Sequence, residues 1–286
     1  MCSWMIDQYG TPEQQKKWLP SMTKFDLFSS YCLTEPDSGS DAQSMKSFAK
    51  DEGSHFVLNG SKCFISGAGS SDLYVVMCKT GEKETSCLIV EKDMPGLSFG
   101  ANEHKLGWNV QPTRVVNFDD VKVPKENLIG KRGQGFKVGL AGLDGGRLNI
   151  ASCSLGGAAK CIETTTQYIK QRKQFGQPLS ANQSMQFKLA EMAINLEASR
   201  QMVRHGARLV TEGDPNKTMY CAMAKNFATD RCFYVVNDCL QMHGGYGYLQ
   251  DYPIERFLRD LRVHMILEGT NEIMLHIIQR TLLKDD

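Results

Sequence analysis

Hydrophobic and polar positions follow two different periods along the chain. Between about residues 28 and 128, short segments rich in β-branched and aromatic residues are separated by turn signals, which is typical of strands. The predicted strands are Ser30 to Thr34, His55 to Leu58, Lys62 to Ser66, Leu73 to Cys78, Ser86 to Val90 and Arg114 to Phe118. Asn59-Gly60 predicts a hairpin between the second and third. Because no helical pattern separates these strands, a barrel or sandwich is favoured over a parallel α/β sheet.

Beyond Gly133 the period becomes helical. One apolar stripe comprises Met185, Leu189, Met192, Leu196 and Val203. A second helix, marked by Met219, Met223, Phe227 and Leu240, ends at His243-Gly244-Gly245, and a third is marked by Ile273, Ile277, Ile278 and Leu282. Residues 136–170 predict another helix, although each of its glycines costs about 1 kcal/mol. Three or four long helices of this kind predict a bundle.

The N-terminal 25 residues are also predicted to be helical. Trp4, Met5 and Ile6 form an apolar turn, and Thr11-Pro12-Glu13 is typical of an N-cap with proline at the first helical position.

Composition narrows the class of protein. Among 286 residues, 33 basic and 32 acidic side chains give a net charge of +1 without long runs of either sign. We therefore expect neither a nucleic-acid surface nor a polybasic membrane patch, and an enzyme acting on a small molecule is favoured. No apolar run approaches the roughly 18 residues that a membrane span needs, so no membrane insertion is expected. Ten cysteines include no Cys-x-x-Cys pair, so reduced thiols are expected and neither a disulfide framework nor a metal site.

The strongest candidate for chemistry is Glu268, in the segment Ile266-Leu267-Glu268-Gly269-Thr270-Asn271-Glu272. Large apolar neighbours raise the pKa of a carboxyl group, and glycine lets the backbone approach a ligand closely. Both properties suit a base that collects a proton near neutral pH. A surface glutamate beside a helix N-terminus would give the same pattern.

Four other segments contain candidate ligand-binding residues. Residues 31–41 leave a strand for a loop dense in hydroxyl groups, and Phe64 could stack on a flat cofactor or simply pack. Arg172 suits a helix C-terminus and equally a pyrophosphate. Residues 241–248 form a glycine-rich loop that could be a binding loop or only a helix C-cap.

Read in order, these segments resemble the acyl-CoA dehydrogenase family over essentially the whole chain. The matching motifs are Thr-Glu-Pro-x-Ser-Gly-Ser-Asp, Phe-Ile-Ser, Arg-Lys-Gln-Phe-Gly, Gln-Met-His-Gly-Gly-Tyr-Gly and Glu-Gly-Thr-Asn-Glu. The stretch Leu143 to Gly156 more narrowly resembles the branch that acts on isobutyryl-CoA in mitochondrial valine breakdown.

The resemblance implies an α+β multidomain fold, with a β-barrel middle domain followed by an all-α four-helix bundle. The expected domains are residues 1–27, a remnant of the family's N-terminal helical domain, 28–130, the barrel, and 131–286, the bundle. The chain is expected to enter near the end of that N-terminal domain.

The resemblance also implies roles for individual residues. Glu268 would be the catalytic base. The expected FAD-binding residues are Tyr31, Cys32, Leu33, Thr34, Glu35, Ser38, Gly39, Ser40, Phe64, Ile65, Ser66, Arg172, Asn182, Gln183, Gln241, Met242, His243, Gly244, Gly245, Thr270, Asn271 and Glu272. The expected acyl-CoA contacts are Ser40, Asp144, Gly145, Gly146, Arg147 and Arg280, although Arg280 equally suits the end of a helix.

The implied activity is FAD-dependent α,β-dehydrogenation of a short branched-chain acyl-CoA, isobutyryl-CoA to methacrylyl-CoA, with electrons passed to electron-transfer flavoprotein. The implied setting is the mitochondrial matrix, and the implied assembly a homo-oligomer, by family a tetramer. Alternatives are another short-chain acyl-CoA dehydrogenase, an acyl-CoA oxidase, or a truncated FAD- and acyl-CoA-binding remnant that does not catalyse.

Overall fold

A computed structural model describes residues 1–284. Contacts divide the chain into two compact units. The first contains residues 1–105 and 109–143, and the second contains residues 106–108 and the chain from Asp144 on. The main division falls within one long helix, α3 (Gly135–Gln171).

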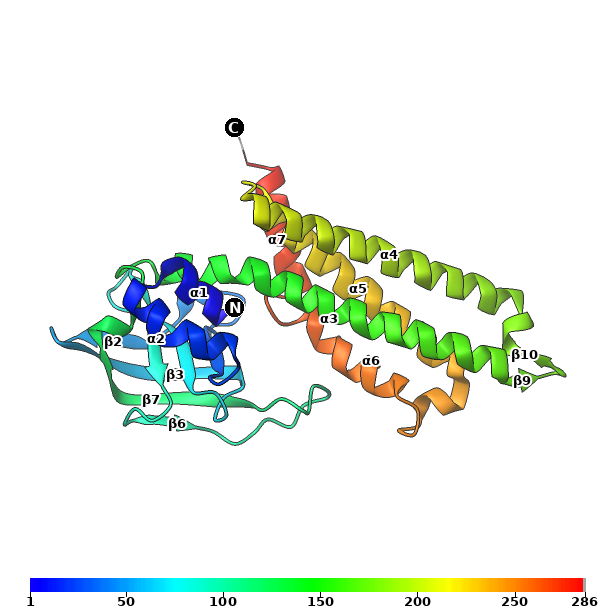
Figure 1. Cartoon of the computed structure of the whole chain (residues 1–286), viewed down its shortest axis with the longest axis horizontal. Helices are drawn as coiled ribbons and strands as arrows, with labels where there is room; N and C mark the ends of the chain where they lie inside the picture. The colour runs from blue at the N-terminus through cyan, green and yellow to red at the C-terminus, as the bar shows by residue number, and fades with distance from the viewer. Residues whose placement is uncertain (285–286) are drawn as a thin grey trace. The chain divides into compact units, whose positions relative to one another are not determined.

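The first unit is a sheet with two helices on it (Figure 1). Its strands are β1 (Ser29–Cys32), β2 (Phe48–Asp51), β3 (His55–Ser66), β4 (Leu73–Lys79), β5 (Thr85–Glu91), β6 (Leu97–Phe99), β7 (Thr113–Pro124) and β8 (Leu128–Ile129). They pair in the order β6-β7-β3-β2-β4-β5-β8, with β1 parallel to β4. A sheet-rich middle domain is confirmed, but the pairings among the described strands form an open path and not a closed barrel.

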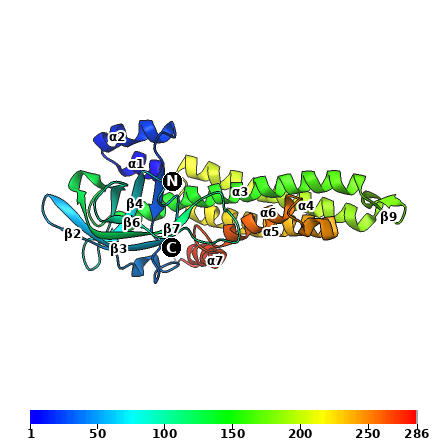
Figure 2. The same cartoon turned by 90° about the horizontal axis from the view of Figure 1, so that it is seen from below.

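Alternation along β4 places its side chains in two separate cores. Tyr74, Val76 and Cys78 pack with residues of β3 and β7, whereas Val75 and Met77 pack with residues of α1 (Cys2–Tyr9) and α2 (Pro12–Thr23). The two helices cover one face of the sheet (Figure 2). Helix α2 begins as its sequence predicts, because Thr11 accepts a hydrogen bond from the Gln14 N–H in a capping box with Pro12 at the first position.

The predicted hairpin at Asn59-Gly60 is wrong. Both residues lie inside the continuous strand β3, which pairs with β7 through a register shift between Leu58 and Gly60. Gly60 has φ 138°, and a Cβ there would overlap Ser47. The glycine is therefore needed for an irregularity within a strand and for the close approach of Ser47. The Asn-Gly dipeptide alone does not distinguish this role from a turn.

The second unit is helical. Besides the C-terminal part of α3 it contains α4 (Gln183–Glu212), α5 (Lys217–His243), α6 (Ile254–Arg262) and α7 (Asn271–Leu282). A two-stranded hairpin, β9 (Lys173–Gln174) and β10 (Gln177–Pro178), joins α3 to α4. Figures 1 and 2 show α4 and α5 side by side, and α6 and α7 also pack against α5.

The apolar stripe predicted on α4 became part of a core, whereas the one predicted on α7 did not, because Ile273, Ile277 and Ile278 are only half-buried and Leu282 is exposed. Met192, Leu196 and Val203 are buried on α4, as predicted, and α5 ends at His243 with Gly244 at its C-cap, where φ is 59°. Helix α6 was not predicted. Among residues 1–284, no helix combines the length and the apolarity needed to cross a bilayer.

Candidate active site and cofactor pocket

Glu268 lies in the turn between a 3₁₀ turn (Val263–Met265) and α7. Its φ is 57° and that of Gly269 is 89°, so two consecutive residues are in the left-handed region. Only glycine adopts this conformation without strain, and a glutamate that holds it must be held by its surroundings. Thr270 then caps α7, its hydroxyl oxygen accepting from the Ile273 N–H at 3.3 Å.

The Glu268 carboxyl group is set against the backbone of α3. A Cβ at Gly146 would overlap its Oε2, so the sequence must carry glycine there for the carboxylate to sit in place. Oε2 is buried and has no hydrogen-bond partner among the described residues, although the residue as a whole is partly exposed. Burial raises the pKa of Glu268 to about 7, against the opposing positive charges of Arg147 and Lys225.

The residues predicted to contact acyl-CoA on α3 lie together beside Glu268. Arg147 donates to Asp144 Oδ1 at 3.0 Å, and the Thr218 hydroxyl donates to Asp144 Oδ2 at 2.7 Å. Both members of this ion pair are buried, and the Nε of Arg147 has no partner among the described residues. Nothing occupies the space within 4 Å of a Cβ built at Gly145.

Arg280 lies at the opposite end of α7, in its last turn, and is exposed there. That position suits the helix C-terminus on electrostatic grounds. Glu272 is exposed in the first turn of α7, where its own N–H and the Thr270 hydroxyl keep its pKa below the ordinary value.

Sequence reasoning missed Lys225, a fully buried cation on α5. Its Nζ donates to the Gly269 carbonyl oxygen at 2.8 Å and to Asn271 Oδ1 at 2.9 Å. The sequence carried a signal, because Lys225 lies three residues from Ala222 and three from Ala228, both on the buried face of the helix.

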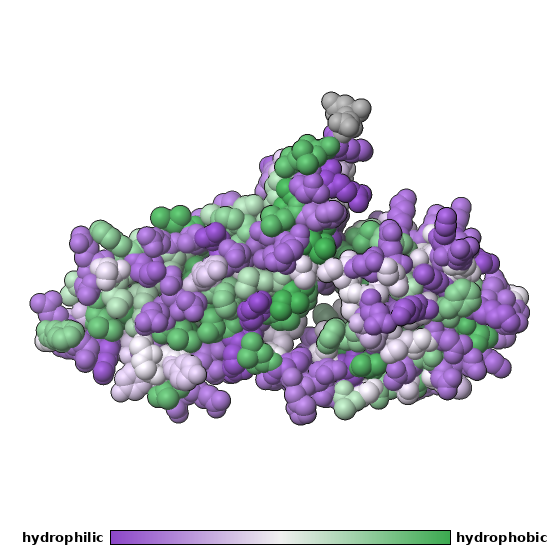
Figure 3. Space-filling model, turned by 180° about the vertical axis from the view of Figure 1, so that it is seen from behind, coloured by the Kyte–Doolittle hydropathy of each residue, from purple (hydrophilic) through white to green (hydrophobic). Residues whose placement is uncertain are grey.

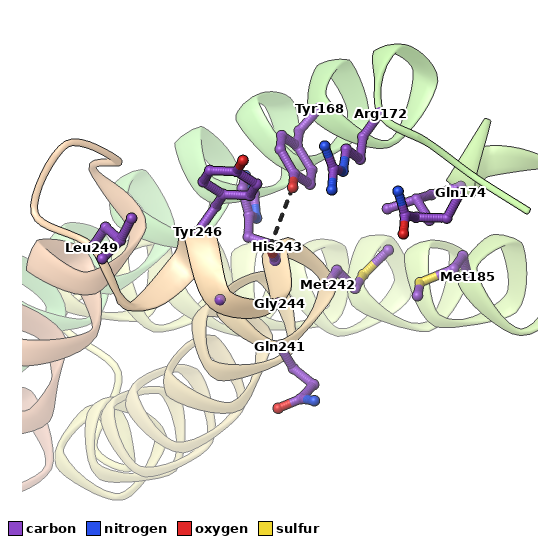
Figure 4. Close-up of a pocket in the computed structure, with 12 residues that line it drawn as sticks. Tyr168, Arg172, Gln174, Met185, Gln241, Met242, His243, Gly244, Tyr246 and Leu249 are labelled. Atoms are coloured by element: carbon purple, nitrogen blue, oxygen red, sulfur yellow. Dashed lines mark hydrogen bonds between the residues drawn. The ribbon is translucent and has the colours of Figure 1, made fainter.

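A second candidate site is a cavity of about 550 Å³ at the end of α3 and the end of α5 (Figure 4). It brings Arg172 together with Gln241, Met242, His243, Gly244 and Gly245, the residues expected to bind one part of FAD. It also includes Tyr246 of the candidate loop 241–248, and residues that were not predicted, namely Tyr168, Gln174, Leu179, Met185 and Leu249. Asn182 and Gln183 are exposed at the start of α4 and do not line it; Asn182 caps that helix by accepting from the Ser184 N–H.

Aromatic and cationic groups shape this cavity. His243 stacks on Tyr168 with ring centroids 4.2 Å apart, and the Tyr168 hydroxyl donates to the His243 carbonyl oxygen at 3.3 Å (Figure 4). The guanidinium carbon of Arg172 lies 5.3 Å from the Tyr246 ring centre. A Cβ at Gly244 or Gly245 would meet nothing within 4 Å, so the backbone is open to a ligand. A fixed cation, an aromatic ring and open backbone suit a nucleotide.

In the first unit, the loop after β1 is held by a buried ion pair. Lys62 Nζ donates to Glu35 Oε1 and to the Leu33 carbonyl oxygen, both at 2.8 Å. Glu35 also accepts from the backbone N–H groups of Lys46 and Ser47. Burial alone would raise the pKa of Glu35, but Lys62 and these N–H groups hold it below its ordinary value. The Glu35 carboxylate thus fixes the loop from within.

The other residues of this unit that were predicted to bind FAD or acyl-CoA differ in how far their side chains are exposed. The side chains of Cys32 and Ile65 are buried in the sheet core, and that of Ser38 is buried with its hydroxyl donating to the Asp41 carbonyl oxygen. Gly39 and Ser40 are exposed in the loop. The Tyr31 hydroxyl donates to the Gly139 carbonyl oxygen at 3.2 Å.

Phe64 is unusual for an aromatic residue in a strand. Its side chain is 70% exposed and its φ is 56°, at an irregularity in the pairing of β3 with β7. Leu33 and Thr34, which follow β1, are half-buried, and Ser66, at the end of β3, is exposed. An aromatic face left open by a strained backbone fits a flat ring such as that of a flavin.

Comparison with known proteins gives the family. The Acyl-CoA dehydrogenase, middle domain, matches residues 30–121, and the Acyl-CoA dehydrogenase, C-terminal domain, matches residues 133–283. The chain belongs to the acyl-CoA dehydrogenase family. Members are oxidoreductases that act on CH–CH bonds and depend on FAD, and one solved relative is a complex with FAD.

Individual relatives are similar over the whole chain. It is 57% identical to the mitochondrial isobutyryl-CoA dehydrogenase of Dictyostelium discoideum, covering 100% of this chain and 70% of that protein. It is 52% identical to the mitochondrial isobutyryl-CoA dehydrogenase of Bos taurus, covering 100% and 69%. A chain from a structural study of the electron transferring flavoprotein of Acidaminococcus fermentans superposes with a TM-score of 0.97 at 41% identity, covering 100% and 76%.

The raised pKa of Glu268 predicts a pH-dependent stability. Its folded pKa of about 7 exceeds the ordinary 4.5, so the folded state loses stability as pH rises between these values and stays lower above pH 7. Relative to wild type, Glu268→Gln should gain stability from pH 5 to pH 8.5, by at most about 3 kcal/mol. Urea unfolding at both pH values measures this. A difference between the two proteins that does not change with pH would contradict the prediction.

Proposed function

We propose that this chain performs the α,β-dehydrogenation of a short branched-chain acyl-CoA, with isobutyryl-CoA as the substrate, and that Glu268 is the base. The observation that carries the proposal is the environment of that carboxyl group. Burial raises its pKa to about 7, and the adjoining backbone at Gly146 leaves room for nothing larger than hydrogen. A base with this pKa is half ionised near neutral pH, where general-base catalysis is most effective.

The chemistry follows from the acidity of the substrate. The proton on the carbon α to a thioester carbonyl is too weakly acidic for a carboxylate unless the carbonyl oxygen is polarised. Glu268 would remove this proton, and its own backbone N–H would donate to the thioester oxygen. Bound FAD supplies the acceptor for the hydride that leaves the β-carbon. Burial of Glu268 Oε2 keeps from that atom the water that would stabilise the charged form.

The residues for FAD fall into three groups. We propose that residues 31–40 and 64–66 contact the isoalloxazine ring, supported by the open aromatic face of Phe64. Arg172, with residues 241–245, would bind the ribityl-adenine part, supported by the cavity that joins them, and Asn182 and Gln183 would contact the same part. Thr270 to Glu272 would complete the site.

The acyl-CoA would contact Ser40, Asp144 to Arg147 and Arg280. The identity of the acyl chain rests on the two isobutyryl-CoA dehydrogenases, whose mitochondrial names also support a mitochondrial location, and within the mitochondrion we propose the matrix. Electron-transfer flavoprotein as the acceptor is supported by the relative from the A. fermentans study.

A homo-oligomer, by family a tetramer, is supported by the surface of the helical unit. Figure 3 shows apolar patches among polar ones on this unit. Phe187 and Ile194, seven residues apart on α4, are 60% and 68% exposed, and Phe175 at the tip of the β9–β10 hairpin is fully exposed. Residues seven apart share one face of a helix, so α4 presents two exposed apolar side chains on one face that a second copy would cover.

The role of Glu268 is tested by the flavin spectrum. Under argon, isobutyryl-CoA should bleach the visible band of the FAD-loaded wild-type chain. Glu268→Gln should keep FAD, shown by an unchanged absorption ratio before substrate, but its bleaching rate should fall at least about 10³-fold because a neutral amide cannot take the α-proton. Bleaching of the variant at the wild-type rate would refute the role.

Gly146 provides a second test. Gly146→Ala should push the carboxylate aside, since the overlapping atom is the end of a side chain, and lower the bleaching rate on the order of 10²-fold. The fold should be unharmed, because alanine has the higher helix propensity. The matched control is Gly156→Ala on the same helix, where a Cβ meets nothing within 4 Å and the rate should stay at the wild-type value. Equal rates in the two variants would contradict the assignment.

The electron acceptor separates a dehydrogenase from an oxidase. After substrate reduction, purified electron-transfer flavoprotein should reoxidise the flavin within the turnover time, whereas air-saturated buffer should release little hydrogen peroxide. The stopped-flow reoxidation rate and a peroxide assay measure the two routes. Peroxide formed in step with turnover, together with no response to the flavoprotein, would favour an acyl-CoA oxidase.

A further inference from the structure

Lys225 is a cation with no contact with water, midway along α5. Burying a lysine costs several kcal/mol unless its donors are satisfied, and no core-packing requirement needs a lysine among alanines. The charge is therefore explained by what its ammonium group binds.

Within residues 1–284, both acceptors of Lys225 Nζ belong to the segment that follows Glu268. They are the Gly269 carbonyl oxygen at 2.8 Å and Asn271 Oδ1 at 2.9 Å. Two other side chains of α5 contact the same segment. The Thr229 hydroxyl, one turn beyond Lys225, lies 3.2 Å from Asn271 Oδ1, and Asn226 Nδ2, from the residue after Lys225, donates to the Asn271 carbonyl oxygen at 3.0 Å. Side chains of α5 thus form hydrogen bonds to both ends of the segment Gly269 to Asn271.

These hydrogen bonds hold a segment next to a strained backbone. Glu268 and Gly269 have φ values of 57° and 89°, and a non-glycine residue leaves the left-handed region unless its neighbours prevent it. Relaxation of Glu268 would rotate its side chain away from Gly146, where the carboxyl group now sits.

We propose that Lys225 is a positioning residue for the catalytic base: its ammonium group holds the backbone of Gly269 and thereby keeps Glu268 in the conformation that places its carboxylate against Gly146. This inference rests on the proposed role of Glu268 as base.

Lys225 also affects the charge of the base. The charged groups that act on Lys225 are Arg147 on α3, Glu268 in the turn before α7, and Glu272 on α7. Burial, together with the Arg147 charge, lowers the pKa of Lys225 to about 8, and the two carboxylates act in the opposite direction. The Lys225 charge in turn lowers the pKa of Glu268. Loss of the ammonium group should therefore shift the acid limb of the activity profile to higher pH.

The experiment uses the FAD-loaded chain and three variants. Lys225→Met removes both donor and charge, Lys225→Gln keeps a donor without the charge, and Lys160→Met, at an exposed site on α3, is the matched control. The first readout does not depend on activity: amide hydrogen exchange of residues 266–272. Lys225→Met should exchange at least about tenfold faster there, Lys225→Gln less so, and Lys160→Met at the wild-type rate.

The second readout is the rate of flavin bleaching by isobutyryl-CoA against pH. Lys225→Met should lower the limiting rate by about ten- to a hundredfold with a small change in the half-saturating substrate concentration, and its acid limb should lie at higher pH. Lys225→Gln should share the shift of the acid limb but lose less of the rate. A lysine that neither positions the base nor acts on its charge would leave both the limiting rate and the acid limb at their wild-type values.

The outcomes separate the inference from the proposed function. Unchanged exchange in residues 266–272 together with an unchanged acid limb overturns the role of Lys225. If the flavin of the wild type is not bleached, or that of Glu268→Gln bleaches at the wild-type rate, the proposed function fails. The exchange data then still test whether Lys225 holds residues 266–272 in place. If Lys225→Met does not fold, Lys225→Gln decides, because a wild-type profile in that variant overturns the inference.

Discussion

The structure of the site depends on one unfavourable interaction: a carboxyl oxygen of Glu268 is buried without a hydrogen-bond partner among the described residues. In water this oxygen would be solvated, so the folded chain must supply the energy that keeps it dry. Burial raises the pKa of the group to about 7, which makes it a proton acceptor near neutral pH. The same burial lowers the stability of the folded state, whereas an ordinary surface glutamate would not.

Three features keep the carboxylate in that place, and each comes from a different element. Helix α3 supplies Gly146, whose missing side chain makes the room. The turn before α7 supplies a left-handed backbone at Glu268, and α5 supplies Lys225, which binds the next peptide group. The helical unit is thus organised around a few polar groups that its apolar core would not by itself require. Strain and buried charge concentrate where function needs a fixed geometry.

Much of this could be read from the sequence, and the reasons are local. Periodicity depends only on which side of an element faces the core, so the α4 stripe from Met192 to Val203 and the strands around Val75 and Val116 were placed correctly. The Thr11-Pro12 cap and the end of α5 at Gly244 also follow from nearest-neighbour chemistry. Glu268 stood out because its apolar flanks and the following glycine are adjacent to it in the chain.

What the sequence determined by itself was therefore the type of most elements and the identity of the candidate base. Only the tertiary structure decided whether Asn59-Gly60 turned or stayed in a strand, because the answer depended on Ser47 packing against Gly60. Likewise, only folding brought Lys225 to Gly269 and Tyr168 to His243, since these partners are far apart in the chain and no local pattern links them. Local propensity fixes elements, whereas the groups that tune a pKa or hold a strained turn are chosen by packing between elements.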